Sequence, residues 1–122
     1  MTLRIAFAGA ACGLLFVGAA AAQTAAYNWT GYGTNVAGSS KCPSYKMTIN
    51  ISVDGNKVTG RFQQEGRPER HFEGTKDAAG LFKTKAEVGG GGSMDVSGSL
   101  KDGDTKVLLD GYCKFGGPMT KK

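Results

Sequence analysis

The sequence predicts an all-β protein, a small antiparallel up-and-down β-barrel of about seven or eight strands with a calycin-like architecture. Apolar and polar residues alternate along several short segments, and turn signals rich in Gly, Asp and Asn separate them at intervals of about 8–14 residues. No segment after the first 22 residues has the periodicity of an amphipathic helix. Closure into a barrel is favoured because it removes exposed strand edges. A two-sheet β-sandwich is the alternative.

The clearest element is a β-hairpin over residues 45–62. Every second residue from Tyr45 to Val53 is apolar, so this segment is expected to be a strand with one buried face. Residues 54–56, Asp-Gly-Asn, can supply the positive φ angles of a tight turn. Val58 and Phe62 then continue the buried face on the returning strand.

The remaining strands are predicted by the same alternation. They are expected over residues 27–33, 70–75, 81–88, 94–100 and 107–113. Gly and Asp mark the turns between them, and residues 114–122 are expected to form a loose, basic tail. Residues 23–122 are therefore interpreted as a single domain.

Residues 1–22 have the pattern of a secretory signal peptide. Arg4 precedes an apolar stretch over residues 5–17, and the small residues 18–22 suit signal peptidase. An uncleaved anchor is disfavoured because Ala and Gly bury little area in lipid. Lipidation at Cys12 is a further alternative, although the apolar stretch continues past it. We expect a periplasmic or secreted protein without stable membrane insertion after cleavage.

Cys42 and Cys113 are the two cysteines that remain after the signal is removed, and they predict one disulfide. It would close a loop of about 70 residues, which the chain-entropy model values at about 4 kcal/mol. A redox or metal-binding role is disfavoured, because there is no Cys-x-x-Cys motif and His71 is the single histidine.

The charge of the chain is modestly positive. Removing Arg4 from 15 Lys and Arg leaves 14 against 10 Asp and Glu, a mature net charge of +4. This favours weak attraction to anionic surfaces and gives no case for a nucleic-acid partner. Lysines could gather into a basic patch, but interspersed acids make a mixed, solvated surface the preferred interpretation; they are Lys76, Lys83, Lys85, Lys101, Lys106, Lys121 and Lys122.

One pattern recurs along the predicted strands: a large apolar residue, any residue, then Gly. Examples are Trp29-Thr30-Gly31 and Phe72-Glu73-Gly74. Alternating large and small inward residues are typical of packing in small barrels. The sharper hypothesis is that the glycines leave a ligand cavity. The residues predicted to line it are Trp29, Tyr45, Phe62, Phe72 and Phe82.

The sequence gives little support for catalysis. His71 is expected to face solvent, and no second histidine is present to build a triad or a zinc site. Asp95 and Asp110 could form a pair of acids, but both are expected to point outward on neighbouring strands. We therefore expect no catalytic residues, no metal and no cofactor.

The layout, with Trp29 in the first strand followed by a meander, resembles the avidin and lipocalin type of secreted barrel. The resemblance is architectural and implies the fold alone: Tyr27 stands where the Gly of the lipocalin Gly-x-Trp start would be, and no biotin-binding set can be placed. A bacterial exported protease inhibitor of barrel fold is another architecture of this size. We therefore expect an exported binding module for a small apolar or aromatic ligand in the barrel interior. The alternative is an envelope protein-interaction module, such as a protease inhibitor acting through surface loops.

Overall fold

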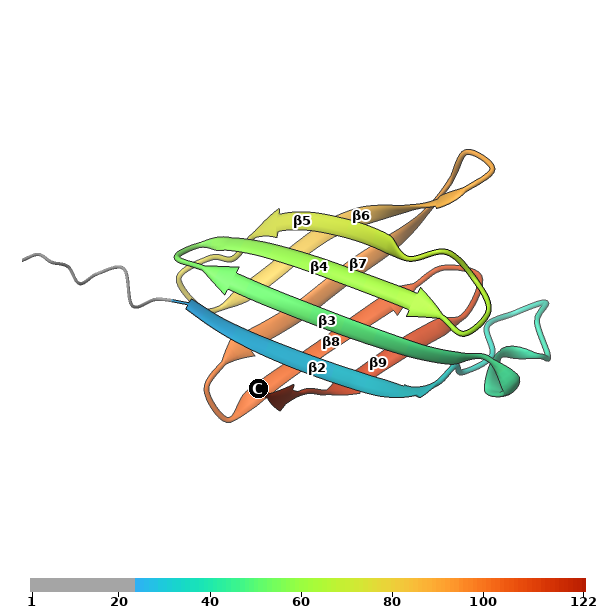
Figure 1. Ribbon diagram of the computed structural model, residues 1–122, viewed down its shortest axis with the longest axis horizontal. Helices are drawn as coiled ribbons and strands as arrows, with labels where there is room; N and C mark the ends of the chain where they lie inside the picture. Colours follow the sequence, from blue (N-terminus) through green and yellow to red (C-terminus); the bar gives the residue numbers. More distant parts are fainter. Residues whose placement is uncertain (1–23) are drawn as a thin grey trace, which may run out of the picture.

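The computed structural model describes residues 24–122, so the predicted signal peptide and Cys12 lie outside the described residues. The chain forms two antiparallel sheets packed face to face (Figure 1). One short 3-10 helix, η2 (Cys42–Ser44), precedes the central hairpin. The strands are β2 (Thr24–Tyr32), β3 (Lys46–Asp54), β4 (Lys57–Gln64), β5 (Arg70–Thr75), β6 (Leu81–Gly89), β7 (Gly92–Lys101), β8 (Asp104–Asp110), β9 (Lys114–Pro118) and β10 (Thr120–Lys121).

Strands adjacent in sequence are adjacent in each sheet, except that β10, the last strand of the chain, pairs with β2. The order is β10-β2-β3-β4-β5 in one sheet and β6-β7-β8-β9 in the other. The predicted all-β, antiparallel fold is confirmed. The two sheets meet along two seams, where an edge strand of one sheet lies beside an edge strand of the other. At one seam β9 and β10 carry the chain from the second sheet to the first. At the other, between β5 and β6, the Thr84 hydroxyl donates to the Glu73 carbonyl oxygen at 2.6 Å. Among residues 24–122, backbone hydrogen bonds between strands do not join the two sheets into a closed ring. The closed barrel therefore stays a prediction, with the two-sheet sandwich as its alternative.

The central hairpin forms as predicted. Val53 pairs with Val58 and Asp54 with Lys57, which leaves Gly55 and Asn56 as a two-residue turn. Gly55 adopts φ +63°, a conformation that tight hairpin turns require and that glycine adopts without steric cost. The alternating residues of β3 are buried, as their sequence pattern predicted.

The prediction of a loose tail over residues 114–122 was wrong. This segment forms β9, which pairs with β8, and β10, which pairs with β2. Phe115 and Met119 are buried in the core, and their burial favours the ordered arrangement. The two residues are separated by Gly116, Gly117 and Pro118, which are weak strand formers and hide the pattern. The last predicted strand also ends earlier, at Asp110.

Glycines on the inward faces make room for aromatic rings. A Cβ atom at Gly60 would overlap Cζ of Phe72, its cross-strand partner. A Cβ atom at Gly98 would lie 2.7 Å from the ring of its partner Phe82 and 2.5 Å from a backbone carbonyl oxygen. At these positions the large-x-Gly pattern is explained by packing of the protein's own side chains.

Replacing Gly60 with Ala is expected to destabilise the fold by about 1–3 kcal/mol, because the new methyl group overlaps the Phe72 ring. Chemical denaturation followed by circular dichroism measures the change. Gly92→Ala is the matched control: its nearest neighbours would lie 3.5 Å from the new Cβ, so we expect less than about 0.5 kcal/mol. Equal stability of the two variants would contradict this account of the glycines.

The predicted Cys42–Cys113 disulfide is present, with Cα atoms 5.7 Å apart and a sequence separation of 71 residues. Both cysteines are buried. A persistent disulfide indicates a non-reducing compartment. Within residues 24–122 no helix is long and apolar enough to cross a membrane.

Removal of the disulfide by the double replacement Cys42→Ala and Cys113→Ala is expected to lower the free energy of unfolding by about 4 kcal/mol, because the unfolded chain regains the entropy of a long loop. Urea denaturation of the two forms gives the difference. The disulfide-bonded protein treated with reductant should show the same loss. A midpoint that does not move on reduction would mean that the bond contributes nothing to stability.

Candidate functional site

Three of the predicted ligand-binding residues form a row in the core between the sheets. Phe62, Phe72 and Phe82 are each only 3% exposed. The ring centroids of Phe62 and Phe72 are 6.2 Å apart, and those of Phe72 and Phe82 are 6.4 Å apart and stacked. Trp29 is half-buried, packs against this core and lies close to Gly31 and Gly117. Most of the interior is therefore occupied by the protein's own side chains.

A cavity of about 240 Å³ opens at the end of the sheets where β3 begins and β4 ends, the right-hand end in Figure 1. We call it the Tyr112 cavity. It contains two of the five predicted ligand residues, Tyr45 and Phe62. Its complete lining is Tyr45, Met47, Phe62, Gln64, Arg67, Pro68, Arg70, Val88 and Tyr112.

The strand register places apolar groups deeper in this cavity and polar groups nearer its opening. Met47 and Phe62 are buried residues of β3 and β4, and they bring apolar surface to the lining. Gln64 pairs with Met47 one step nearer the end of the sheet, and Arg70 pairs with Phe62 at the start of β5. Arg67 belongs to the turn between β4 and β5, where its N–H donates to the Gln64 carbonyl oxygen at 2.9 Å.

The disulfide holds two aromatic walls of the cavity. The Tyr45 N–H donates to the Cys42 carbonyl oxygen at 3.0 Å, and Tyr112 directly precedes Cys113. The Tyr112 ring packs edge-on against Phe115 with centroids 5.7 Å apart. Its hydroxyl donates to Oε1 of Gln64 at 2.8 Å. Residues distant in sequence are thus fixed around one opening.

Burial raises the pKa of the Tyr112 hydroxyl, while the positive charges of Arg67 and Arg70 partly oppose the rise. The positive charges of both guanidinium groups are therefore close enough to affect the Tyr112 hydroxyl. Within residues 24–122 neither arginine has a carboxylate within 4.0 Å. Glu69 instead contacts Arg61 at 3.9 Å and His71 at 3.3 Å. The site has a positive rim over an apolar floor.

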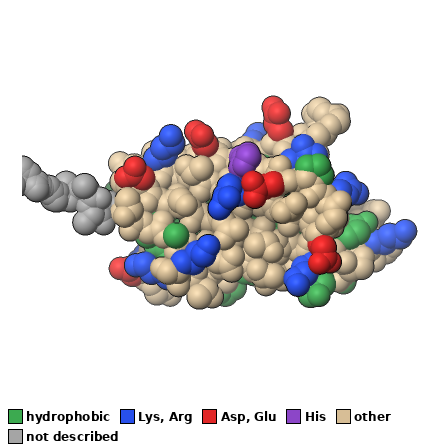
Figure 2. Space-filling model, viewed as in Figure 1, with side chains coloured by type: hydrophobic (Ala, Val, Ile, Leu, Met, Phe, Trp, Pro, Cys, Tyr) green, Lys and Arg blue, Asp and Glu red, His purple; other side chains and the backbone are tan. Residues whose placement is uncertain are grey.

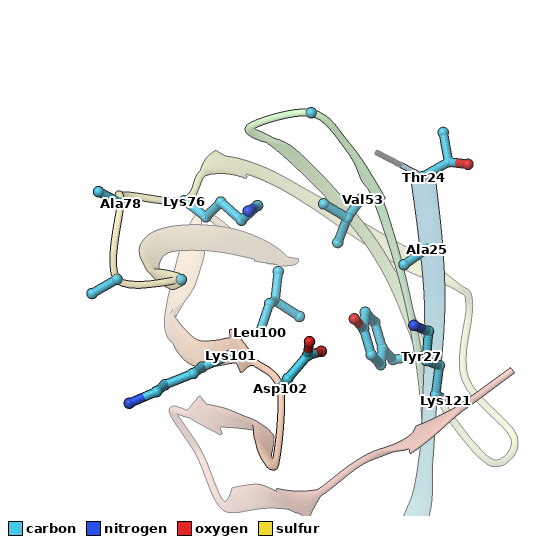
Figure 3. A pocket seen from close by; sticks show the side chains of 13 residues that line it. Thr24, Ala25, Tyr27, Val53, Lys76, Ala78, Leu100, Lys101, Asp102 and Lys121 are labelled. Atoms are coloured by element: carbon cyan, nitrogen blue, oxygen red, sulfur yellow. The ribbon is translucent and has the colours of Figure 1, made fainter. Parts of the chain in front are cut away.

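A second cavity, of about 380 Å³, lies at the opposite end of the sheets. Val53 and Leu100 point toward one another across it, and Lys101 points away from it (Figure 3). Tyr27 is its one aromatic residue, and Asp102 brings a carboxylate among the lysines of its rim. Turn residues and small side chains make up much of the remaining lining, so this cavity offers an aromatic ligand less apolar surface than the Tyr112 cavity.

The outer surface carries interspersed charges of both signs on the face shown in Figure 2. The His71 side chain is 63% exposed beside Glu69. Asp95 and Asp110 lie opposite one another on β7 and β8, as expected. Asp95 pairs with Lys85 at 2.6 Å, and the hydrogen bond and charge of this lysine lower the pKa of Asp95. Within the described part of the chain no group of three His, Cys, Asp or Glu residues could hold a metal ion.

Sequence reasoning missed the polar half of the site: Gln64, Arg67, Arg70 and Tyr112. Two of these carried a readable signal. Gln64 continues the inward phase of Phe62, and Arg70 has the inward phase of Phe72, so both are polar residues at buried-face positions at the same end of neighbouring strands. Arg67 and Tyr112 lie in loops, where alternation gives no direction.

No family model matches this chain, and no match was found among curated proteins or solved structures.

Tyr112 is expected to titrate at higher pH than an ordinary tyrosine, whose pKa is 10.0. Because the folded state holds the proton more tightly, Tyr112 contributes stability below pH 10, and that contribution is lost as the pH rises through the raised pKa. Absorbance at 295 nm against pH should show one late-titrating tyrosine that is missing in Tyr112→Phe. A Tyr32→Phe control, at a position 58% exposed, should keep it. An unchanged late phase in Tyr112→Phe would refute the assignment.

Proposed function

We propose that this protein is an exported, non-catalytic binding module, periplasmic or secreted, that takes a small apolar or aromatic ligand in the Tyr112 cavity. The observation that carries the proposal is the composition of that cavity, in which Tyr45, Phe62 and Tyr112 surround a space of about 240 Å³. Aromatic walls around an apolar floor, with polar groups converging at the rim, are typical of small-molecule sites. The predicted ligand site in the barrel interior is thereby placed, in this proposal, at one end of the interior.

Two further features support this choice of end. The aromatic row of Phe62, Phe72 and Phe82 fills the middle of the interior, so a ligand is accommodated only beyond it. The disulfide fixes Tyr45 and Tyr112 before any ligand arrives, which reduces the entropy lost on binding. The same disulfide supports export, and closure of the two seams into a barrel would hold the mouth of the cavity in shape.

We expect 2-naphthalenemethanol, a neutral two-ring alcohol, to bind the protein with a measurable heat in isothermal titration calorimetry. Replacing half-buried Val88 with Phe should fill the cavity and weaken binding at least about tenfold, because the ring occupies the ligand's space. The matched control is Leu81→Phe, which adds the same ring at a position that is 50% exposed and outside this cavity.

Thermal unfolding of both variants checks that the fold is retained. Failure of the wild-type chain to bind both this alcohol and anionic probes with the same two-ring body, or equal binding by Val88→Phe and the wild type, would refute the Tyr112 cavity as the ligand site. Either result would favour the alternative prediction, an envelope protein-interaction module.

A further inference from the structure

We propose that the ligand carries an oxyanion, a carboxylate or a phosphate, and that Arg67, Arg70 and the amide of Gln64 bind it at the rim of the Tyr112 cavity. The inference rests on the proposed function, because it assigns the chemical class of ligand to the same site. The ligand is then amphipathic: its aromatic or apolar body lies on Met47 and Phe62, and its charged head faces the arginines.

The first argument is the charge at the rim. Arg67 and Arg70 both line the cavity, and within residues 24–122 no carboxylate lies within 4.0 Å of either. Arg61, on the outer face, does have such a partner in Glu69. A planar guanidinium group matches a carboxylate or a phosphate with two parallel hydrogen bonds. The two cavity arginines are therefore available for an anion from outside the chain.

The second argument is an unpaired buried donor. Gln64 is 8% exposed and lines the cavity, and its Oε1 accepts a hydrogen bond from the Tyr112 hydroxyl. Within the described chain its amide nitrogen has no hydrogen-bond partner. A buried N–H group without an acceptor is unfavourable, and an oxyanion held by the arginines would supply one. Because the Tyr112 hydroxyl donates to Oε1, the nitrogen is the end of the Gln64 amide that is left free.

The third argument is the position of the Arg70 guanidinium group, which lies against the backbone of the neighbouring hairpin. A Cβ atom at Gly89, at the end of β6, would lie 2.8 Å from Nη2 of Arg70, so the guanidinium group packs directly against the glycine backbone. Gly89 has φ +88°, a conformation that residues with side chains rarely adopt. The backbone of this hairpin thus leaves room for the arginine head at the rim. A preorganised cation loses less entropy when it binds an anion.

Calorimetric titration at pH 7 with three probes of shared body tests the inference: 2-naphthoate, 2-naphthyl phosphate and the neutral 2-naphthalenemethanol. The wild-type chain should bind at least one of the two anions about tenfold or more tightly than the alcohol. The anion that binds more tightly identifies the head group. Arg67→Gln and Arg70→Gln should each weaken anion binding about tenfold relative to binding of the alcohol by the same variant. Arg61→Gln, the matched surface control, should change neither.

Equal affinity for the alcohol and both anions, or arginine variants that bind the anions as tightly as the wild type, would overturn the oxyanion assignment while leaving the proposed function in place. Failure of all three probes to bind would instead overturn the proposed function and this inference with it. Gln64→Leu gives a second, independent measurement, since it removes the amide donor. It should weaken anion binding several-fold relative to binding of the alcohol by the same variant.

Discussion

The Cys42–Cys113 disulfide is the constraint on which the end of the molecule with the Tyr112 cavity depends. It joins the loop before β3 to the loop after β8, and so connects the two sheets at an end where no strand crosses between them. The other ties nearby are few: the Thr34–Lys114 bridge, and the hydrogen bond from Tyr112 to Gln64. Tyr45 and Tyr112 lie beside the two cysteines, so the covalent bond that stabilises the fold also sets the shape of the cavity.

The packing of the interior explains why the Tyr112 cavity lies at an end. Inward glycines allow the rings of Phe72 and Phe82 to lie flat against neighbouring strands, where any larger residue would push them away. This arrangement fills the space between the sheets and leaves no room for a guest near Phe72. The last inward residues of the strands are different, because the aromatic row ends at Phe62 and polar side chains follow it. The cavity begins where the apolar packing stops.

Much of the fold could be predicted from the sequence, because a strand with one buried face has alternating apolar and polar residues. The hairpin around Gly55 and the disulfide needed only local or counting arguments. The ordered C-terminal strands could not be predicted, since Gly116, Gly117 and Pro118 interrupt the alternation between Phe115 and Met119. The pairing of Tyr112 with Gln64 spans 48 residues, and only the packing of the two sheets brings them together. Alternation does not show which loop meets which strand end.

The proposed site links binding to stability. In the free protein two guanidinium groups line one cavity without a carboxylate partner in the described chain, and the Gln64 amide nitrogen lacks an acceptor. The unpaired amide raises the free energy of the folded state, because a buried donor loses its hydrogen bonds to water. The proposed oxyanion would supply an acceptor for this amide and pair with the arginines, and a ligand that binds only the folded state stabilises it by mass action. On this proposal, a residue that is unfavourable for folding at this end would contribute to the binding of an amphipathic anion.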